Sequence, residues 1–189
     1  EKNAAHIFGA HERTVNGVKG VLFNVWAPKA LSVSVVGEFN KYDGRVHLME
    51  RIEDTGVFEL FIPGLAAGCG YMYEIKRQGK GTTRKLDPVS RQISSVPITA
   101  SVVSDENMPD SYAWNDGLWM IKRKKEAGKK KPVTVYEVSL TDWLKEKSAD
   151  ELVDFVKQEG YTHVCFLPVA EYLNEEMNGY STLGYFAVT

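Results

Sequence analysis

The sequence is poor in the features that mark several large protein classes. Only 2 of its 189 residues are Cys, 7 are Pro and 4 are His. A disulfide-stapled secreted domain would need more cysteines, and a zinc site would need a spacing such as Cys-x-x-Cys, which is missing. Cys69 and Cys165 each lie beside apolar or small residues, so we expect two buried, reduced thiols. We expect neither a metal nor a cofactor.

Long apolar runs and an excess of one charge are also missing. No run approaches the roughly 20 apolar residues that span a bilayer, and no signal-peptide pattern opens the chain. The formal net charge of -2 gives no reason to expect nucleic acid or a membrane as a partner. We therefore expect a cytoplasmic location. Because the first residue is Glu1 and not Met, we also expect a segment of a longer protein.

The first informative pattern in the sequence is a pair of predicted β-strands. Val21, Phe23 and Val25 alternate along the chain, as in a pleated strand with one face on a core. Trp26-Ala27-Pro28 ends this strand, because Pro cannot donate to a central ladder. A second strand with Val33 and Val35 on one face follows. The two strands lead directly to a polar turn.

The turn from Phe39 to Gly44 places an aromatic side chain, Tyr42, between Asn40 and Asp43. An aromatic face flanked by amide and carboxylate groups suits a sugar ring, since sugar C–H groups stack on it while hydroxyls bond the polar flanks. The alternative is a hairpin tip with a half-buried Tyr42. The spacing alone leaves both interpretations open.

The composition of the chain divides it into three further regions: a β-sandwich with its lead-in, a polar linker and a β–α–β segment. Short strands separated by turn signals over residues 20–104 predict a β-sandwich, preceded by a polar lead-in at residues 1–19. Residues 105–131 are polar and lysine-rich, which suits either a phosphate-binding patch or a solvated linker, and we favour the linker. From 132 to 189 the pattern is β–α–β.

The β–α–β pattern has specific signals. A strand is expected over Thr134–Leu140, and Ser148 with Glu151 matches a capping box at the start of a helix. Gly160 is a natural residue to end that helix. His163–Val169 is a nearly continuous apolar run, as expected of a parallel strand buried on both faces.

Several motifs, in one order along most of the chain, carry a resemblance to a known family. They are Gly9-Ala10-His11-Glu12, Gly20–Pro28, Ser32–Asn40, Tyr42–Arg45, Glu59–Gly64, Tyr71–Lys76, Asp87-Pro88, Val135–Val138, Gly160–His163, Leu167–Val169 and Gly184–Ala187. The chain resembles the amino-terminal region of bacterial glycogen (1,4-alpha-glucan) branching enzymes. The resemblance implies a mainly β fold: a family 48 carbohydrate-binding module with an immunoglobulin-like β-sandwich, then the first β–α–β portion of an incomplete (β/α)8 barrel of the alpha-amylase superfamily, glycoside hydrolase family 13.

The resemblance also implies a function. Branching enzymes cut an α-1,4-glucan and transfer the severed chain to a 6-hydroxyl, a retaining reaction that needs two carboxyl groups about 5 Å apart. In the family these come from later barrel strands, so we assign no catalytic residue here and expect the segment to be inactive. The implied partners are α-glucan, contacted by Tyr42, Asn40 and Asp43, and the remainder of the barrel.

Tyr180 is the one barrel-site residue that the resemblance carries over. It matches a Tyr that forms an aromatic wall beside the sugar at the cleavage point, and packing within a loop is the alternative. The chain departs from the family at Asn178 and at Tyr42, where Trp is usual, and at Val188, where Pro is usual. Two rival functions therefore stay open: a debranching or amylolytic hydrolase, and a non-catalytic glucan-binding or scaffold protein.

Overall fold

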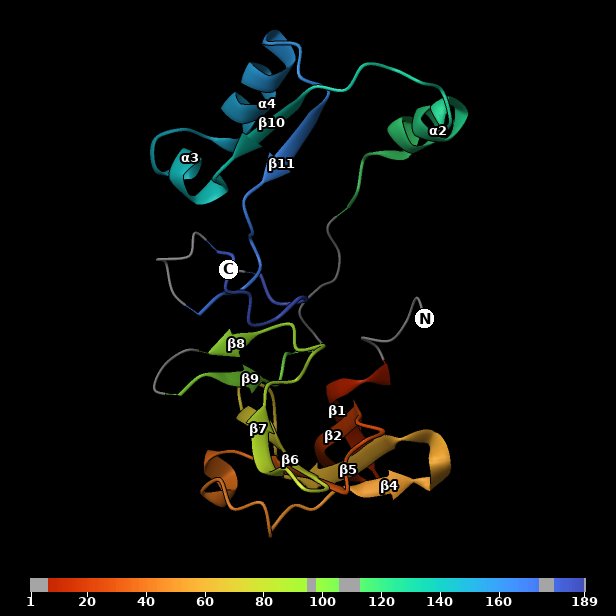
Figure 1. Ribbon diagram of the computed structural model, residues 1–189, viewed down its shortest axis with the longest axis vertical. Helices are drawn as coiled ribbons and strands as arrows, with labels where there is room; N and C mark the ends of the chain where they lie inside the picture. Colours follow the sequence, from red (N-terminus) through yellow and green to blue (C-terminus); the bar gives the residue numbers. More distant parts are fainter. Residues whose placement is uncertain (1–6, 95–97, 106–112, 174–178, 189) are drawn as a thin grey trace. The chain divides into compact units, whose positions relative to one another are not determined.

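The computed structural model describes residues 7–94, 98–105, 113–173 and 179–188. The chain divides into two compact units, one of Glu1–Glu106 with Val169–Thr189 and one of Asn107–Pro168. The first unit holds a β-sandwich and the second a β–α–β segment (Figure 1), so the fold is mainly β as predicted. The division groups residues 169–189 with the sandwich and not with the β–α–β segment. The domain boundaries drawn from the sequence therefore stay predictions.

One sheet of the sandwich has the strand order β1-β2-β5-β4 and is antiparallel throughout. Its strands are β1 (Gly9–Val15), β2 (Val18–Trp26), β4 (Glu50–Ile52) and β5 (Val57–Pro63). The central strand β2 pairs along its length with β1 on one side and β5 on the other. It therefore anchors this sheet, and the predicted end at Trp26 is confirmed.

The second sheet has the order β3-β6-β9-β8, with β7 also pairing with β6. Its strands are β3 (Ser32–Val36), β6 (Gly70–Arg77), β7 (Gly81–Lys85), β8 (Ile93–Ser94) and β9 (Ala100–Val102). Strand β6 pairs with β9 at its start and with β7 over the rest of its length. The β6–β7 ribbon places Arg84 opposite Glu74.

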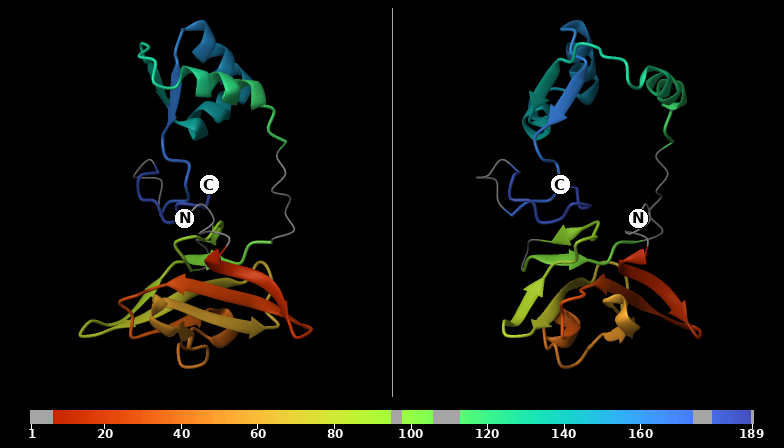
Figure 2. Two further views of the ribbon diagram at one scale, coloured as in Figure 1. Left: turned by 90° about the vertical axis from the view of Figure 1, so that its right-hand side faces the viewer. Right: turned by 45° about the vertical axis from the view of Figure 1, so that its right-hand side comes forward.

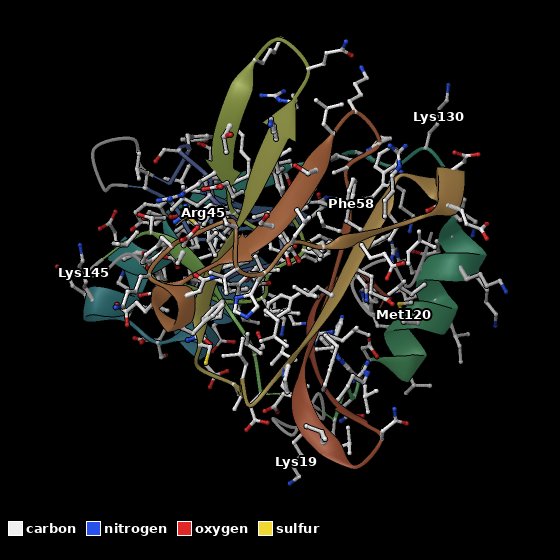
Figure 3. The ribbon with its side chains drawn as sticks, turned by 90° about the horizontal axis from the view of Figure 1, so that it is seen from below. Lys19, Arg45, Phe58, Met120, Lys130 and Lys145 are labelled. Atoms are coloured by element: carbon white, nitrogen blue, oxygen red, sulfur yellow. The ribbon has the colours of Figure 1, made fainter. Side chains whose placement is uncertain are left out.

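The core lies between these two sheets (Figures 2 and 3). Val21, Phe23 and Val25 of β2 are at most 5% exposed, and they pack with Phe58 of β5 and Tyr71 of β6. Phe58 is labelled in Figure 3. Fully burying an apolar side chain of this size stabilises the fold by about 1.5–3 kcal/mol. The alternation predicted from the sequence is thus confirmed as the inward face of β2.

Two segments contain more regular structure than the sequence predicts. The expected lead-in includes β1, which forms an edge strand on β2. Its outer half is exposed and mostly polar, so it lacks the apolar alternation that marks a half-buried strand. The expected linker includes α2 (Gly117–Glu126), none of whose residues is buried. Its basic end is solvated, and Lys131 pairs with Glu126 at 2.7 Å.

The second unit contains two parallel strands, β10 (Val135–Val138) and β11 (His163–Phe166), joined through α3 (Leu140–Glu146) and α4 (Ala149–Gln158). The predicted capping box of α4 is confirmed, with Ser148 and Glu151 exchanging hydrogen bonds. Val138 of β10 packs against Leu152 and Val156 of α4. The expected strand over Thr134–Leu140 is too long, because α3 begins at Leu140.

Strand β11 differs from its prediction in burial. All four of its residues are exposed, including Val164 at 37% and Phe166 at 45%. Both cysteines are free thiols, as predicted, but Cys165 on β11 is exposed and Cys69 only half-buried. For β11 and Cys165 the expected burial is wrong because, among the described residues, the two-stranded sheet has no further strand beside β11. No helix among the described residues is long and apolar enough to cross a membrane.

Candidate functional site

The turn after β3 holds Tyr42 in an unusual backbone conformation. The short helix Glu38–Asn40 is followed by Lys41 and Tyr42, which have positive φ angles of 54° and 57°. Such angles are uncommon outside Gly and are strained for a bulky residue. Two hydrogen bonds hold them: Lys41 N donates to Glu38 O at 3.0 Å, and Tyr42 N donates to Gly37 O at 2.9 Å. The turn therefore fixes the direction of the Tyr42 side chain.

Asn40 helps to build this turn with its side chain. It is 8% exposed. Its Oδ1 accepts from Gly37 N at 3.0 Å, and its Nδ2 donates to Val35 O at 2.9 Å and lies 2.9 Å from His47 Nδ1. Burial lowers the pKa of His47, which favours the neutral ring that can accept this hydrogen bond. A glucan could reach the Asn40 amide only by breaking the turn, which argues against its predicted role as a sugar contact.

Asp43 is accessible but engaged. Arg45, labelled in Figure 3, donates from Nε to Oδ1 at 2.9 Å and from Nη2 to Oδ2 at 2.7 Å. The Arg45 side-chain hydrogen bonds lower the pKa of Asp43 to about 2, so the carboxylate is ionised at neutral pH. A pair of this kind at the surface contributes little to stability, because water screens both charges. Asp43 is therefore free to exchange Arg45 for a sugar hydroxyl at low cost.

Tyr42 is half-buried, and the cation of Arg84 covers one face of its ring. The Arg84 guanidinium carbon lies 5.6 Å from the ring centroid, its Nη2 donates to Tyr42 O at 2.9 Å, and its Nε donates to Glu74 Oε2 at 3.1 Å. Glu74 and Arg84 are cross-strand partners on β6 and β7. The sequence does not point to either residue, because they come together only through the pairing of β6 with β7.

Tyr180 lies elsewhere in the first unit. It is 63% exposed, in a segment where Leu173 N donates to Ser181 O at 3.1 Å and Leu183 N donates to Glu171 O at 2.7 Å. Asn178, the neighbouring departure from the family pattern, is outside the described residues. An exposed Tyr is consistent with an aromatic wall, and that role stays a prediction.

A buried polar cluster lies inside the sandwich at the Asp87-Pro88 motif. Asp87 is 1% exposed, and its Oδ2 accepts from Tyr71 Oη at 2.6 Å and from Tyr73 Oη at 3.2 Å. Its Oδ1 accepts from Val89 N at 2.9 Å. Burial raises the pKa of Asp87, and the Tyr71 hydrogen bond opposes that rise. Because every partner is internal, this cluster holds the sheet together and offers no surface for chemistry.

Comparison with known proteins links the turn and the sandwich to a family. The family carbohydrate-binding module 48 (isoamylase N-terminal domain) matches residues 7–90. The 1,4-alpha-glucan branching enzyme GlgB of Methylococcus capsulatus is 42% identical over 99% of this chain, and that of Thiobacillus denitrificans is 44% identical over 97%. The chain resembles the amino-terminal region of bacterial branching enzymes. In both cases it covers 26% of the relative, so it spans about a quarter of the branching enzymes it matches.

Solved structures agree on the fold. The catalytic module of the glycogen-degrading pneumococcal virulence factor SpuA matches 96% of this branching-enzyme-like chain, with a TM-score of 0.60 and 21% identity. The Group B Streptococcus pullulanase SAP gives the same TM-score at 20% identity. This chain covers 32% and 28% of those two chains. At such identities the likeness concerns the fold alone.

Proposed function

We propose that this chain is the amino-terminal segment of a 1,4-alpha-glucan branching enzyme, with a sandwich that binds α-glucan and a β–α–β portion that begins the catalytic barrel. The observation that carries the proposal is the identity of about 40% to branching enzymes along 96% or more of the chain. The proposal includes residues 20–104 as the binding module and 132–189 as the barrel portion, together with a cytoplasmic location.

The exposed apolar side chains of the second unit support the barrel part of this proposal. Val135 of β10 is 53% exposed, and Val164 and Phe166 of β11 are 37% and 45% exposed. A parallel sheet is normally covered on both faces by helices or by further strands. The remainder of a (β/α)8 barrel, which takes about 250 residues in all, would supply that cover. The remainder of the barrel would also supply the catalytic carboxyl groups, since no catalytic residue is assigned to this chain.

The segment alone is therefore expected to leave amylose unchanged. Retaining chemistry requires a nucleophile and an acid about 5 Å apart, and this chain is assigned neither. The measurement is the count of α-1,6 branches and of new reducing ends after incubation with purified chain. New branches made by the chain alone would contradict the proposal, and new reducing ends without branches would favour the hydrolase alternative.

Glucan binding by the sandwich is expected to depend on the Tyr42 ring. Tyr42→Ala removes the one aromatic face that the turn presents, and we expect affinity for maltoheptaose to fall about five-fold, as for the loss of roughly 1 kcal/mol. Calorimetric titration of the purified chain measures this. Tyr42→Phe keeps the ring and its backbone, and is expected to bind within about two-fold of the original chain.

Two further variants locate the binding. Arg84→Ala uncovers one face of the Tyr42 ring and removes a cation–π contact worth about 0.5–1 kcal/mol at an exposed site. This variant is therefore expected to bind glucan at least as tightly as the original chain.

Tyr180→Ala is expected to leave the glucan affinity of the segment unchanged, because the proposed cleavage site is incomplete. Equal affinity of the original chain and Tyr42→Ala would place the glucan elsewhere or show that the sandwich serves only for domain packing.

A further inference from the structure

A pocket of about 260 Å³ lies at one open end of the sandwich, between the end of β2 and the β6–β7 ribbon. It is lined by Trp26, Ala27, Pro28, Lys29, Ala30, Ile75, Arg77, Thr83 and Lys85. Neither Tyr42 nor Arg84 is among these residues. Successive residues of a strand point to opposite faces, so Arg84 faces the turn while its neighbours Thr83 and Lys85 face the pocket. The pocket is therefore distinct from the Tyr42 site.

The apolar side of the pocket is held in place by backbone contacts. Trp26 is 63% exposed, and its Nε1 donates to Thr55 O at 3.3 Å. Ala27 N donates to Gly56 O at 2.8 Å, and Ala30 N donates to Ala27 O at 2.9 Å. Gly56 has a φ of 77°, and a Cβ there would lie 2.7 Å from Pro28. The indole therefore presents an exposed aromatic face beside Pro28.

The charged groups around this face all have one sign. Lys29, Arg77 and Lys85 line the pocket, and no Asp or Glu does. Within the described ranges, none of the three forms an ion pair with a carboxylate at 4.0 Å or less. The chain as a whole has a net charge of -2, so three cations without a lining carboxylate are a local excess. Arg and Lys together are the usual protein ligands of phosphate groups.

From this combination we propose that the pocket binds a phosphorylated sugar, with the sugar ring on Trp26 and the phosphate held by the cations that line the pocket. A neutral glucan would gain nothing from the cations, and inorganic phosphate alone would leave the indole unused. Thr83 adds a hydroxyl that can bond either a sugar hydroxyl or a phosphate oxygen. The volume is below the 300–1,000 Å³ typical of drug-sized ligand sites, which suits a short ligand. A free hexose phosphate and a phosphate ester at a glucan end share this chemistry.

The test uses the whole chain labelled with ¹⁵N in a phosphate-free buffer, with glucose 6-phosphate as the probe and the Trp26 indole N–H as the reporter. We expect a saturable shift of this resonance. Glucose, maltotriose and inorganic phosphate are each expected to bind at least about five-fold more weakly, since each lacks one of the two contacts. No saturable shift, or equal binding of any of these three, overturns the proposal. A phosphorylated maltotriose that binds more tightly than glucose 6-phosphate would identify the glucan ester as the source, and weaker binding would identify the free sugar phosphate.

Variants separate the pocket from a general charge effect. Arg77→Ala is expected to weaken glucose 6-phosphate binding at least about five-fold. The matched control Lys80→Ala removes one positive charge from the exposed β6–β7 loop, outside the pocket, and is expected to stay within about two-fold. If Arg77→Ala unfolds, Lys85→Ala serves in its place with the same expected loss. Equal effects of pocket and control variants would overturn the proposal, whatever Tyr42→Ala does to glucan binding.

Discussion

Replacing Asp87 with Ala is expected to lower the free energy of unfolding of the sandwich by about 2–4 kcal/mol, because hydrogen bonds to a buried charged group are worth about 1.5–3 kcal/mol and their loss leaves unsatisfied partners. Tyr71 and Tyr73 are 1% and 0% exposed, so neither hydroxyl can turn to water once the carboxylate is gone. The Val89 N–H loses its acceptor as well. Urea denaturation, followed by circular dichroism, measures the change.

The matched control for this substitution is Asp43→Ala. Asp43 is also a carboxylate with several hydrogen bonds, but its partner Arg45 is exposed and can be solvated. We expect its loss to change stability far less than the loss of Asp87 does. If Asp43→Ala cost as much as Asp87→Ala, the cluster inside the sandwich would have no special role in stability.

The pH dependence of the Asp87→Ala cost has a definite sign. Burial raises the pKa of Asp87 in the folded state, so the folded chain binds more protons than the unfolded chain between the two pKa values. The part of the Asp87 contribution that depends on its bound proton is therefore full below the unfolded pKa, about 3.9, and is lost as pH rises through the folded pKa, while the hydrogen bonds of the carboxylate remain. The difference in stability between the original chain and Asp87→Ala is therefore expected to be larger at about pH 4, close to the unfolded pKa, than at neutral pH.

Local signals predicted the parts of the fold that depend on neighbouring residues. The inward face of β2 follows from the alternation of Val21, Phe23 and Val25, and the start of α4 follows from Ser148 and Glu151. Ser139 carries a similar signal for α3, since its Oγ accepts from Asp142 N at 3.2 Å. That signal lies inside an apolar run that also suits a strand, so the helix was not predicted.

Non-local pairing decided what the sequence could not show. Strand β1 gains its structure from its ladder with β2, and its own exposed residues carry no alternation. Non-local pairing also builds the Tyr42 site. Arg84 contacts Tyr42, 42 residues away in sequence, because β7 pairs with β6 in the register that sets Arg84 opposite Glu74. The sequence predicts Asn40 as a sugar contact because its amide flanks the Tyr42 ring in a polar turn. Its partners Val35 and His47, which bury it, become neighbours only when the turn closes.

Gly37→Ala is expected to lower the free energy of unfolding by about 2–3 kcal/mol through overpacking. A Cβ at this position would lie against the Phe39 ring and 2.5 Å from the backbone oxygen of Gly70. The backbone of Gly37 is extended, with a φ of -172°, so the cost is steric and does not come from the φ angle. The Phe39 ring can turn, but Gly70 O belongs to the start of β6 and can move only with the sheet. Thermal and urea unfolding measure the loss.

The same substitution is expected to weaken glucan binding, because Gly37 holds the turn that carries Tyr42. Gly37 O accepts from Tyr42 N at 2.9 Å, and Gly37 N donates to Asn40 Oδ1 at 3.0 Å. A shift of Gly37 away from β6 therefore moves the aromatic ring. Gly70→Ala is the control, since its Cβ would meet only the Ala100 Cβ at 3.7 Å, an ordinary contact. If Gly37→Ala matched Gly70→Ala in stability, the close approach would be unimportant. If it lost stability but kept its affinity for maltoheptaose below the unfolding temperature, Tyr42 would not depend on this turn for its orientation.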